Sequence, residues 1–232
     1  METVDKSSME QQLAEKKASL GPVLGIFAKE PVPGRVKTRL CPPLSATEAA
    51  EVYRVCLEET VGAMIRGPFT LVLFHAGREQ YFRGAFPGLP LFPQAEGDLG
   101  RRMEQALKTL LEHGHTSAVL IGSDSPDLPL ARVEEAIAVL ARADCVTVPA
   151  GDGGYVLVGE HRHHPELFRD IPWSTPRVLD ATRRRAAELN IDYRELASWE
   201  DVDDLVSLKR LLQRSPRSAT AKFTLARLAH CL

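Results

Sequence analysis

The chain has 232 residues, which suits one α/β domain and is long enough to bury a sizeable core. Its net charge of −2 gives no basic field that would point to nucleic acid, and no apolar run is long enough to cross a bilayer. Since the N-terminus lacks the apolar core of a signal peptide, we expect a cytoplasmic protein. The cysteines show no CxxC and no zinc spacing, so we interpret them as reduced packing residues: Cys41, Cys56, Cys145 and Cys231.

Strand and helix patterns alternate along the chain after a polar extension over residues 1–20, to which we assign no chemistry. The predicted elements of the first half are a strand at Val23–Ala28, a helix from the capping box of Ser45 and Glu48 to about Arg66, a strand at Phe69–His75, a short helix at Arg78–Phe86, a strand at Leu91–Gln94, a helix from Asp98 or Gly100 to about His113, and a strand at Ala118–Ile121. Those of the second half are a helix at Leu130–Arg142, strands at Cys145–Pro149 and Tyr155–Val158, a helix capped by Ser174 and reaching Leu189, a strand at Tyr193–Leu196, and helices at Asp203–Gln213 and Ala219–Cys231.

This alternation predicts an α/β fold with a mainly parallel, doubly wound sheet. We expect a single domain over residues 21–214, followed by a C-terminal helix within 215–232. The paired short strands around Gly151 predict an antiparallel edge to the sheet.

The central motif is Gly122-Ser-Asp124-Ser-Pro-Asp127-Leu128, which follows the buried run ending at Ile121. Ligands of open α/β sheets bind at the carboxyl ends of strands, and an Asp there can hold a hard cation that grips substrate phosphates. Asp127 precedes the helix at Leu130, so a capping role is its simpler interpretation. Asp124 lies too close to the strand end for capping alone, and we interpret it as functional.

A basic loop follows the first strand. Lys29, Arg35, Lys37 and Arg39 place four cations within eleven residues, and Gly34 lets the backbone approach a ligand closely. Arg binds phosphate oxygens in a bidentate fork and Lys supplies a point charge, so the loop suits a polyphosphate. The spacing is not that of a Walker loop.

Three further motifs have both a structural and a functional interpretation. Asp152-Gly-Gly-Tyr155 is either a hairpin turn or a turn facing a substrate hydroxyl or phosphate. In Ile171-Pro-Trp173-Ser174-Thr175 the serine is a good helix cap, and Trp173 before a helix N-terminus can stack on a ring. In Asp201-Val-Asp203-Asp204, Asp203 either caps a helix or supplies a second metal ligand, if the fold brings it to Asp124. We interpret the His161–His164 run as a solvated loop rather than a zinc site.

Together these segments resemble the nucleotide-diphospho-sugar transferase superfamily with its GT-A fold, and most closely bacterial proteins similar to phospholactate guanylyltransferase. The resemblance covers residues 22–213 and rests on five segments in fixed order: Pro31–Leu40, Gly122–Leu128, Asp152–Tyr155, Pro172–Thr175 and Asp201–Asp203. The first loop departs from the glycine-rich GGxGxR form of better-known nucleotidyltransferases, and the metal motif departs from a strict Asp-x-Asp.

The resemblance implies Mg²⁺ or Mn²⁺ on Asp124, with Asp203 as the candidate second ligand. The residues expected to act in catalysis are Asp124, Lys37 and Asp152. Those expected to contact the nucleotide and its phosphates are Lys29, Gly34, Arg35, Lys37, Thr38, Arg39, Gln94, Asp98 and Arg101. Those expected to face the sugar or acceptor are Asp152, Gly153, Gly154, Tyr155, Trp173, Ser174 and Thr175.

Two reactions fit these residues. In glycosyl transfer an acceptor hydroxyl attacks the sugar of a nucleotide-sugar, and we favour this reaction because the sequence group as a whole resembles glycosyltransferases. In nucleotidyl transfer a phosphorylated small molecule attacks the α-phosphate of a nucleoside triphosphate, which the four-cation loop favours. A nucleotide-sugar binder without activity is the alternative from another class. The expected partners are a nucleotide and a small-molecule acceptor, with neither nucleic acid nor membrane, and the sequence does not indicate an oligomeric state.

Overall fold

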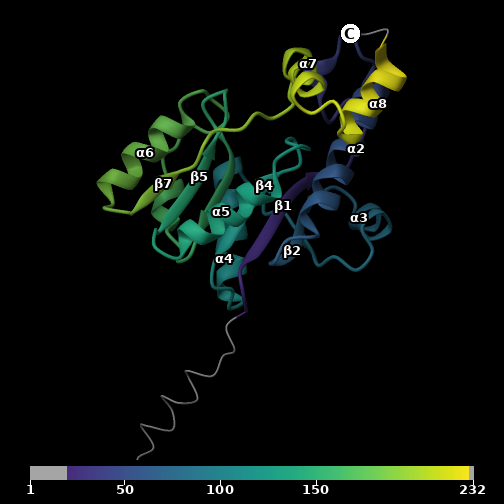
Figure 1. Cartoon of the computed structure of the whole chain (residues 1–232). Helices are drawn as coiled ribbons and strands as arrows, with labels where there is room; N and C mark the ends of the chain where they lie inside the picture. Colours follow the sequence, from purple (N-terminus) through teal and green to yellow (C-terminus); the bar gives the residue numbers. More distant parts are fainter. Residues whose placement is uncertain (1–19, 230–232) are drawn as a thin grey trace, which may run out of the picture.

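The computed structural model describes residues 20–229, and its centre is a seven-stranded sheet in the order β3-β2-β1-β4-β6-β5-β7 (Figure 1). The strands are β1 (Val23–Lys29), β2 (Thr70–Ala76), β3 (Leu91–Pro93), β4 (Ala118–Gly122), β5 (Cys145–Pro149), β6 (Tyr155–Glu160) and β7 (Tyr193–Glu195). The α-helices are α2 (Ala46–Met64), α3 (Glu79–Ala85), α4 (Leu99–Glu112), α5 (Leu130–Leu140), α6 (Val178–Glu188), α7 (Leu205–Arg214) and α8 (Ala219–Leu228). Two 3₁₀ turns are η1 (Thr38–Leu40) and η2 (Pro165–Phe168).

The predicted fold class is confirmed. Strand β1 pairs in parallel with β2 and β4, and β3 and β7 extend the sheet in parallel with β2 and β5. Strand β6 runs antiparallel to both β4 and β5. The antiparallel pairing therefore lies in the part of the sheet that ends at β7, where β6 is the third strand from the edge rather than the outermost.

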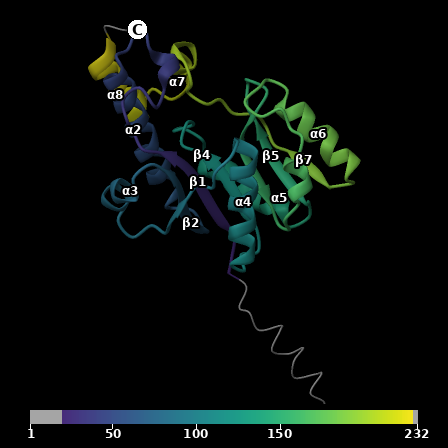
Figure 2. The ribbon, with the colours of Figure 1, turned by 180° about the vertical axis from the view of Figure 1, so that it is seen from behind.

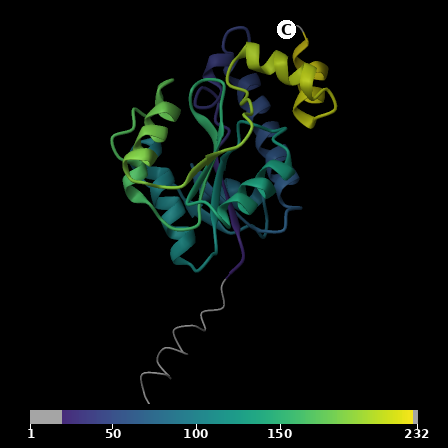
Figure 3. The same ribbon diagram turned by 60° about the vertical axis from the view of Figure 1, so that its left-hand side comes forward.

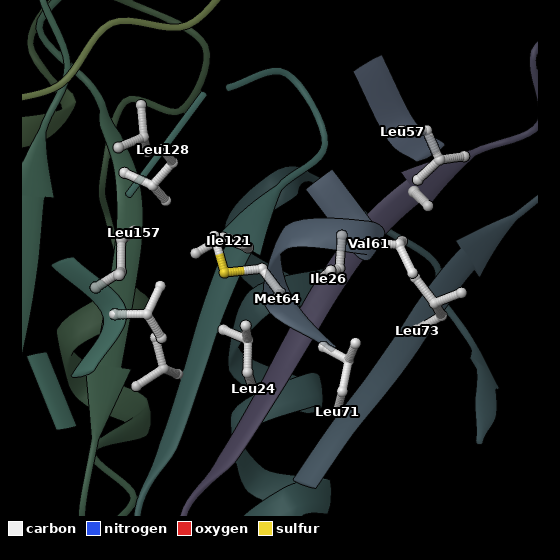
Figure 4. Close-up of a cluster of buried hydrophobic side chains, with 14 of the residues drawn as sticks. Leu24, Ile26, Leu57, Val61, Met64, Leu71, Leu73, Ile121, Leu128 and Leu157 are labelled. Carbon is white, nitrogen blue, oxygen red and sulfur yellow. The ribbon is translucent and has the colours of Figure 1, made fainter. Parts of the chain in front are cut away.

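Two helical layers cover the sheet, as the view in Figure 3 shows. Because side chains alternate along a strand, Leu24 and Ile26 of β1 face the layer of α2 and α5, whereas Val23 faces the layer of α4, η2 and α6. Figure 2 shows α4 lying across the second face. In Figure 4 Met64 of α2 lies over the leucine and isoleucine side chains of the first face. These two cores position the loops at the strand ends.

A third cluster joins the C-terminal helices to the outer side of α2. Leu208 and Leu211 of α7 and Leu228 of α8 pack against Val52 of α2, and Leu40 of the basic loop lies among them. Among residues 20–229, every helix is too short or too polar to traverse a bilayer.

The capping box of Ser45 and Glu48 is confirmed, and Asp98 caps α4 by accepting from the Arg101 backbone N–H at 2.8 Å. The predicted cap at Ser174 is wrong, because Ser174 lies at φ 62° before a turn and α6 begins only at Val178. Asp203 had a capping and a metal-ligand interpretation. The structure excludes the first, because Asp204 and Ser207 form the capping box of α7.

The remaining differences concern boundaries and the chain ends. Helix α5 begins after Pro129, while the Asp127 side chain bonds elsewhere, so its predicted capping role is wrong. Except for Leu20, the predicted polar extension lies outside the described residues, and so does the predicted end of the last helix at Cys231.

Candidate functional site

The loops that follow β1, β4 and β7 meet at the carboxyl end of the parallel strands. The segment after β7 crosses this end of the sheet, as the yellow-green connection to α7 shows in Figure 1. Trp199 N–H donates to the Pro149 carbonyl at 3.0 Å, and Val202 N–H donates to the Asp124 carbonyl at 2.8 Å. The second bond sets Asp203 beside the loop that carries Asp124.

The Lys37 ammonium lies between two carboxylates. Its Nζ forms an ion pair with Asp124 Oδ1 and lies 3.2 Å from Asp203 Oδ1. The Lys37 side chain is 3% exposed, whereas those of Asp124 and Asp203 are 44% and 40% exposed. Arg39 reaches Asp203 from the solvent side, with Nη1 at 3.8 Å from Oδ2. The two acids therefore share one buried cation while keeping part of their surface open to water.

Electrostatics supports this arrangement. Burial lowers the pKa of Lys37, but Asp124 and Asp203 more than offset it, so the pKa is raised and the ammonium stays charged. A third acid lies nearby: burial, followed by the negative charges of Asp203, Asp152 and Asp124, raises the pKa of Asp201 to about 6. Asp201 therefore lies within the electrostatic reach of the other three acids and of Lys37.

The local backbone and one helix side chain position this cluster. Lys37 has φ 47° and ψ 36°, a left-handed conformation that is uncommon for a residue with a side chain, and the turn η1 follows directly. Tyr53 of α2 pairs its hydroxyl with Ser123 Oγ at 2.7 Å and accepts the Lys29 N–H at 2.7 Å. This buried tyrosine links the start of the basic loop to the residue before Asp124.

The rest of the basic loop is open to solvent. Lys29, Arg35, Thr38 and Arg39 are exposed, and Gly34 lies in an exposed turn with φ 76°. Hydrogen bonds from Arg78, with Nε at 2.8 Å, lower the pKa of the buried Glu30 carboxylate, and the positive charge of Arg35 adds to this effect. The loop thus presents cations outward, whereas Lys37 alone turns inward to the acids.

Three residues are predicted to lie near the nucleoside, and two of them, Gln94 and Asp98, make contacts that hold the fold. The Gln94 amide donates to the Phe74 and Ala28 carbonyls at 2.9 and 3.3 Å, so these contacts hold the end of β3. Asp98 caps α4, and Arg101 donates to Glu104 at 2.8 Å while its side chain remains 61% exposed. Arg101 therefore keeps most of its side chain available for a ligand, whereas Gln94 is half-buried.

The glycine turn after β5 is tightly packed on one side. Asp152 Oδ1 accepts the Gly154 N–H at 2.9 Å, and the Asp152 side chain is exposed. A Cβ at Gly153, where φ is 88°, would lie 2.1 Å from the Pro176 carbonyl oxygen. The Gly153 carbonyl in turn accepts the Leu179 N–H at 2.9 Å. The turn therefore holds the 172–178 segment against the end of β5.

Trp173 is part of an aromatic cluster. Its ring stacks on Phe168 with a centroid distance of 6.3 Å and meets the edge of Tyr155 at 6.4 Å. A Cβ at Gly100 would lie 2.0 Å from the indole Nε1, so the first turn of α4 requires glycine here. Thr175 Oγ1 donates to the Pro172 carbonyl at 2.7 Å, and Ser174 is exposed. The fold thus brings Trp173 to the segment that carries Asp98 and Arg101.

Two site residues had no role in the sequence-based assignment. Asp201 lies in a quoted motif, but only the fold shows that it belongs with the other acids. Tyr53 sits in the apolar pattern of a helix, and nothing in that pattern distinguishes it from a packing residue. Burial raises its pKa, so its hydroxyl stays protonated and is able to donate.

The described part of the chain contains no group of three or more His, Cys, Asp or Glu side chains that could hold a metal ion.

The run His161–His164 was predicted to be a solvated loop. This prediction is wrong for two of its residues, because the rings of His163 and His164 are mostly buried beside carboxylates. His163 and His164 are 18% and 16% exposed, and His163 binds Glu104 and Glu160. Its two ring nitrogens lie 3.0 and 3.2 Å from those carboxylates.

Comparison with known proteins supplies a family and a fold. Residues 58–175 match the family described as "Uncharacterized protein conserved in bacteria (DUF2064)". A protein from Desulfovibrio desulfuricans G20, described as a candidate nucleotide-diphospho-sugar transferase, has a crystal structure that is 30% identical, with a TM-score of 0.84 over 91% of this chain and 96% of that one. No curated protein matches the sequence.

More distant structures share the fold alone. Rv0371c from Mycobacterium tuberculosis H37Rv, in a complex with manganese, is 18% identical with a TM-score of 0.54 over 84% of this chain and 100% of that one. A cytidylyltransferase from Leptospira borgpetersenii serovar Hardjo-bovis, strain JB197, is 11% identical with a TM-score of 0.52 over 92% and 97%. The fold is that of the nucleotide-diphospho-sugar transferases.

Proposed function

Since the chain belongs to the DUF2064 family of bacterial proteins, we propose that it is a transferase that uses a nucleotide-activated donor and a divalent cation. The observation that carries this proposal is that Asp124 and Asp203 meet at the carboxyl end of the sheet, where both contact the Lys37 ammonium beside outward-facing arginines. In open α/β sheets this edge is where ligands bind.

The two acids fit Mg²⁺ or Mn²⁺. They are hard oxygen donors, they already lie around a shared positive charge, and about two fifths of each side chain is open to solvent. Mg²⁺ is commonly held by one or two carboxylates with water and substrate phosphates, so a larger protein ligand set is not required. A cation held by Asp124 and Asp203 would offset the negative charge of the donor diphosphate.

The basic loop supplies the phosphate contacts in this proposal. Arg35 and Arg39 are exposed and able to grip phosphate oxygens, with Lys29, Gly34 and Thr38 beside them. Lys37 has a different surrounding, since its ammonium is buried against both acids. We assign to Lys37 the task of holding the two carboxylates together and of adding positive charge beneath the phosphates. Arg101, Asp98 and Gln94 would border the nucleoside.

The opposite side of the site would receive the sugar and the acceptor. Asp152 is the exposed acid of this side, in a turn with Gly153 and Gly154, and we assign it as the base that takes the proton of the acceptor hydroxyl. The Trp173 ring, packed between Tyr155 and α4, would form an apolar wall, and Ser174 and Thr175 would offer hydroxyl groups.

We favour glycosyl transfer as the reaction. The acceptor oxygen forms a bond to the anomeric carbon, the bond from that carbon to the diphosphate oxygen breaks, and the nucleoside diphosphate leaves. The 30% identical structure described as a candidate nucleotide-diphospho-sugar transferase supports this choice. The exposed Arg35 and Arg39 favour the second candidate, nucleotidyl transfer, in which pyrophosphate leaves from a triphosphate.

Ligand screening tests the proposal. Nucleoside triphosphates and nucleotide-sugars are added to the protein with and without Mn²⁺, and thermal unfolding is followed, because a ligand of the native state raises the apparent stability. We expect a shift that needs both nucleotide and Mn²⁺ and that Asp124→Asn removes. ³¹P NMR of the products then separates the reactions: nucleoside diphosphate indicates glycosyl transfer, and pyrophosphate indicates nucleotidyl transfer. A protein that binds no nucleotide under either condition contradicts the proposal.

A further inference from the structure

Asp127, which follows Asp124 in the same loop, is only 5% exposed and accepts hydrogen bonds from three side chains. Arg214 donates to it through Nε at 2.8 Å and Nη2 at 3.0 Å, Ser215 Oγ donates at 2.6 Å, and the Trp199 indole lies at 3.4 Å. Although burial opposes ionisation, the bonds from Arg214 and Ser215 lower the pKa of Asp127 and keep it charged.

Arg214 also binds the segment that carries Asp203. Its Nη1 donates to Glu200 Oε2 at 2.6 Å and its Nη2 to the Glu200 carbonyl at 3.0 Å. The guanidinium lies 5.9 Å from the centroid of the Trp199 ring. One side chain therefore contacts both the β4 loop, through Asp127, and the segment that leads to Asp203.

These contacts close a loop in the chain. The segment leaves the sheet at Trp199, passes Asp203, forms α7 and returns at Arg214, where the beginning and the end both meet Asp127. Between Trp199 and α7 the chain has little regular structure of its own, and Val202 provides the backbone bond to Asp124. The segment that carries Asp203 is therefore anchored to the Asp124 loop at both of its ends.

We infer that Asp127 and Arg214 form a positioning pair that sets Asp203 against Asp124 and so prepares the cation site without touching the cation. The inference rests on the proposed function for the identity of the cation, but not for the geometry. Side chains that orient metal ligands from outside typically change metal affinity by about 10- to 100-fold when they are removed.

The test compares Arg214→Met with Arg210→Met. Arg210 lies on the same helix, and its Nη1 donates to Oε1 of the same Glu200 side chain at 2.9 Å, but this ion pair does not include Asp127. The first readout needs no metal: the NMR signal of the Lys37 ammonium, which is visible only while burial and its two carboxylates slow proton exchange. We expect the signal to be lost in Arg214→Met and kept in Arg210→Met.

The second readout is Mn²⁺ binding by calorimetry. We expect affinity to fall by about 10-fold or more in Arg214→Met, to fall less in Arg214→Lys, and to stay unchanged in Arg210→Met. The double variant Asp127→Asn/Arg214→Met should bind Mn²⁺ no more weakly than Arg214→Met alone, because both changes remove the same Asp127–Arg214 interaction. Arg214→Lys, which keeps the charge, serves for both readouts if Arg214→Met does not fold.

The outcomes separate the two proposals. A Lys37 signal and an Mn²⁺ affinity that are unchanged in the Arg214 variants overturn the positioning pair, while wild-type Mn²⁺ binding upholds the proposed function. A wild-type protein that binds no Mn²⁺, with or without nucleotide, overturns the metal-dependent function, and the Lys37 signal then decides on the positioning pair alone.

Discussion

Two charged clusters in this protein have the same composition, a basic side chain between two carboxylates, but their surroundings differ. The open cluster consists of Lys37, Asp124 and Asp203, and the closed cluster consists of His163, Glu104 and Glu160. The acids of the open cluster are 44% and 40% exposed, whereas those of the closed cluster are 8% and 0% exposed.

The difference in exposure assigns different tasks to the two clusters. In the open cluster the base is buried and the acids keep free surface, so a ligand has room to bind. In the closed cluster the acids are covered, and Glu160 Oε1 is buried without a hydrogen-bond partner among the described residues. Desolvated charge is stabilised only by its partners, so the closed cluster serves to tie the loop after β6 to α4. Charge pattern alone does not distinguish the two; access to water does.

The largest expected effect is on the open cluster. Asp124→Asn should lower metal-dependent turnover by at least about 100-fold, about 2.7 kcal/mol in the barrier, because the carboxylate proposed to hold the cation is neutralised. The measurement is initial rate against Mn²⁺ concentration. Glu104→Gln in the closed cluster is the matched control and should leave the metal dependence intact. Full metal-dependent turnover in Asp124→Asn would sink the assignment of the open cluster as the active site.

The second effect is on the closed cluster. His163→Ala leaves Glu160, which is 0% exposed, beside Glu104 without the shared base, so we expect a loss of about 3 kcal/mol in the free energy of unfolding. Urea denaturation measures it. Lys37→Met in the open cluster is the control and should cost clearly less, since both acids there reach water. Equal losses in the two variants would mean that exposure does not distinguish the clusters.

A third effect tests the outer surface of the open cluster. Arg39→Ala should weaken donor binding by about 1.5 kcal/mol, slightly more than 10-fold, if one charged hydrogen bond to phosphate is lost. The Arg39 side chain is 76% exposed, so stability should change little. Calorimetric titration with nucleotide provides the affinity, and Arg83→Ala on α3, an arginine paired with Glu79, controls for loss of surface charge. Unchanged affinity for every nucleotide bound by the wild type would remove Arg39 from the phosphate site.

The smallest effect is a pH dependence of stability. Burial lowers the pKa of His163, but Glu160 and Glu104 outweigh it, so the pKa is raised above its ordinary value of 6.5. A raised pKa means that the stabilisation is complete below pH 6.5 and is lost as the pH rises through the folded-state value. Stability should therefore fall in the range above pH 6.5. Unfolding curves at several pH values should show this slope in the wild type and a reduced slope in His163→Gln.

Much of the fold was accessible from the sequence because the signals are local. Short apolar runs marked most of the strands, and the Ser45–Glu48 capping box and Asp98 marked two helix starts that the structure confirms. The errors arose where a local signal had two solutions. Asp203 and Asp204 are both good caps, and the Ser207 contacts select Asp204. Ser174 has the right side chain for a cap, but its backbone is left-handed.

The candidate site was accessible only in part. The motifs around Asp124 and the basic loop indicated phosphate and metal chemistry, since residue type and strand position suffice for that inference. They did not show that Lys37 turns inward while Arg35 and Arg39 face solvent, because burial depends on how the loop packs against α2 and α7. The surroundings of Asp201 and Tyr53 were also hidden, since Asp201 feels the charges of Asp152 and Asp124, and Tyr53 bonds to Ser123, all distant in the chain.

The sequence by itself determined the α/β class, the order of most elements and the residues with the chemistry for a nucleotide site, because periodicity, capping and residue type are properties of neighbouring positions. Only the tertiary structure decided that Asp203 meets Asp124 across Lys37, that Asp127 binds Arg214 instead of capping a helix, and that His163 is buried between two acids. These contacts join segments from opposite parts of the chain, and their energies depend on burial and geometry that no local pattern encodes.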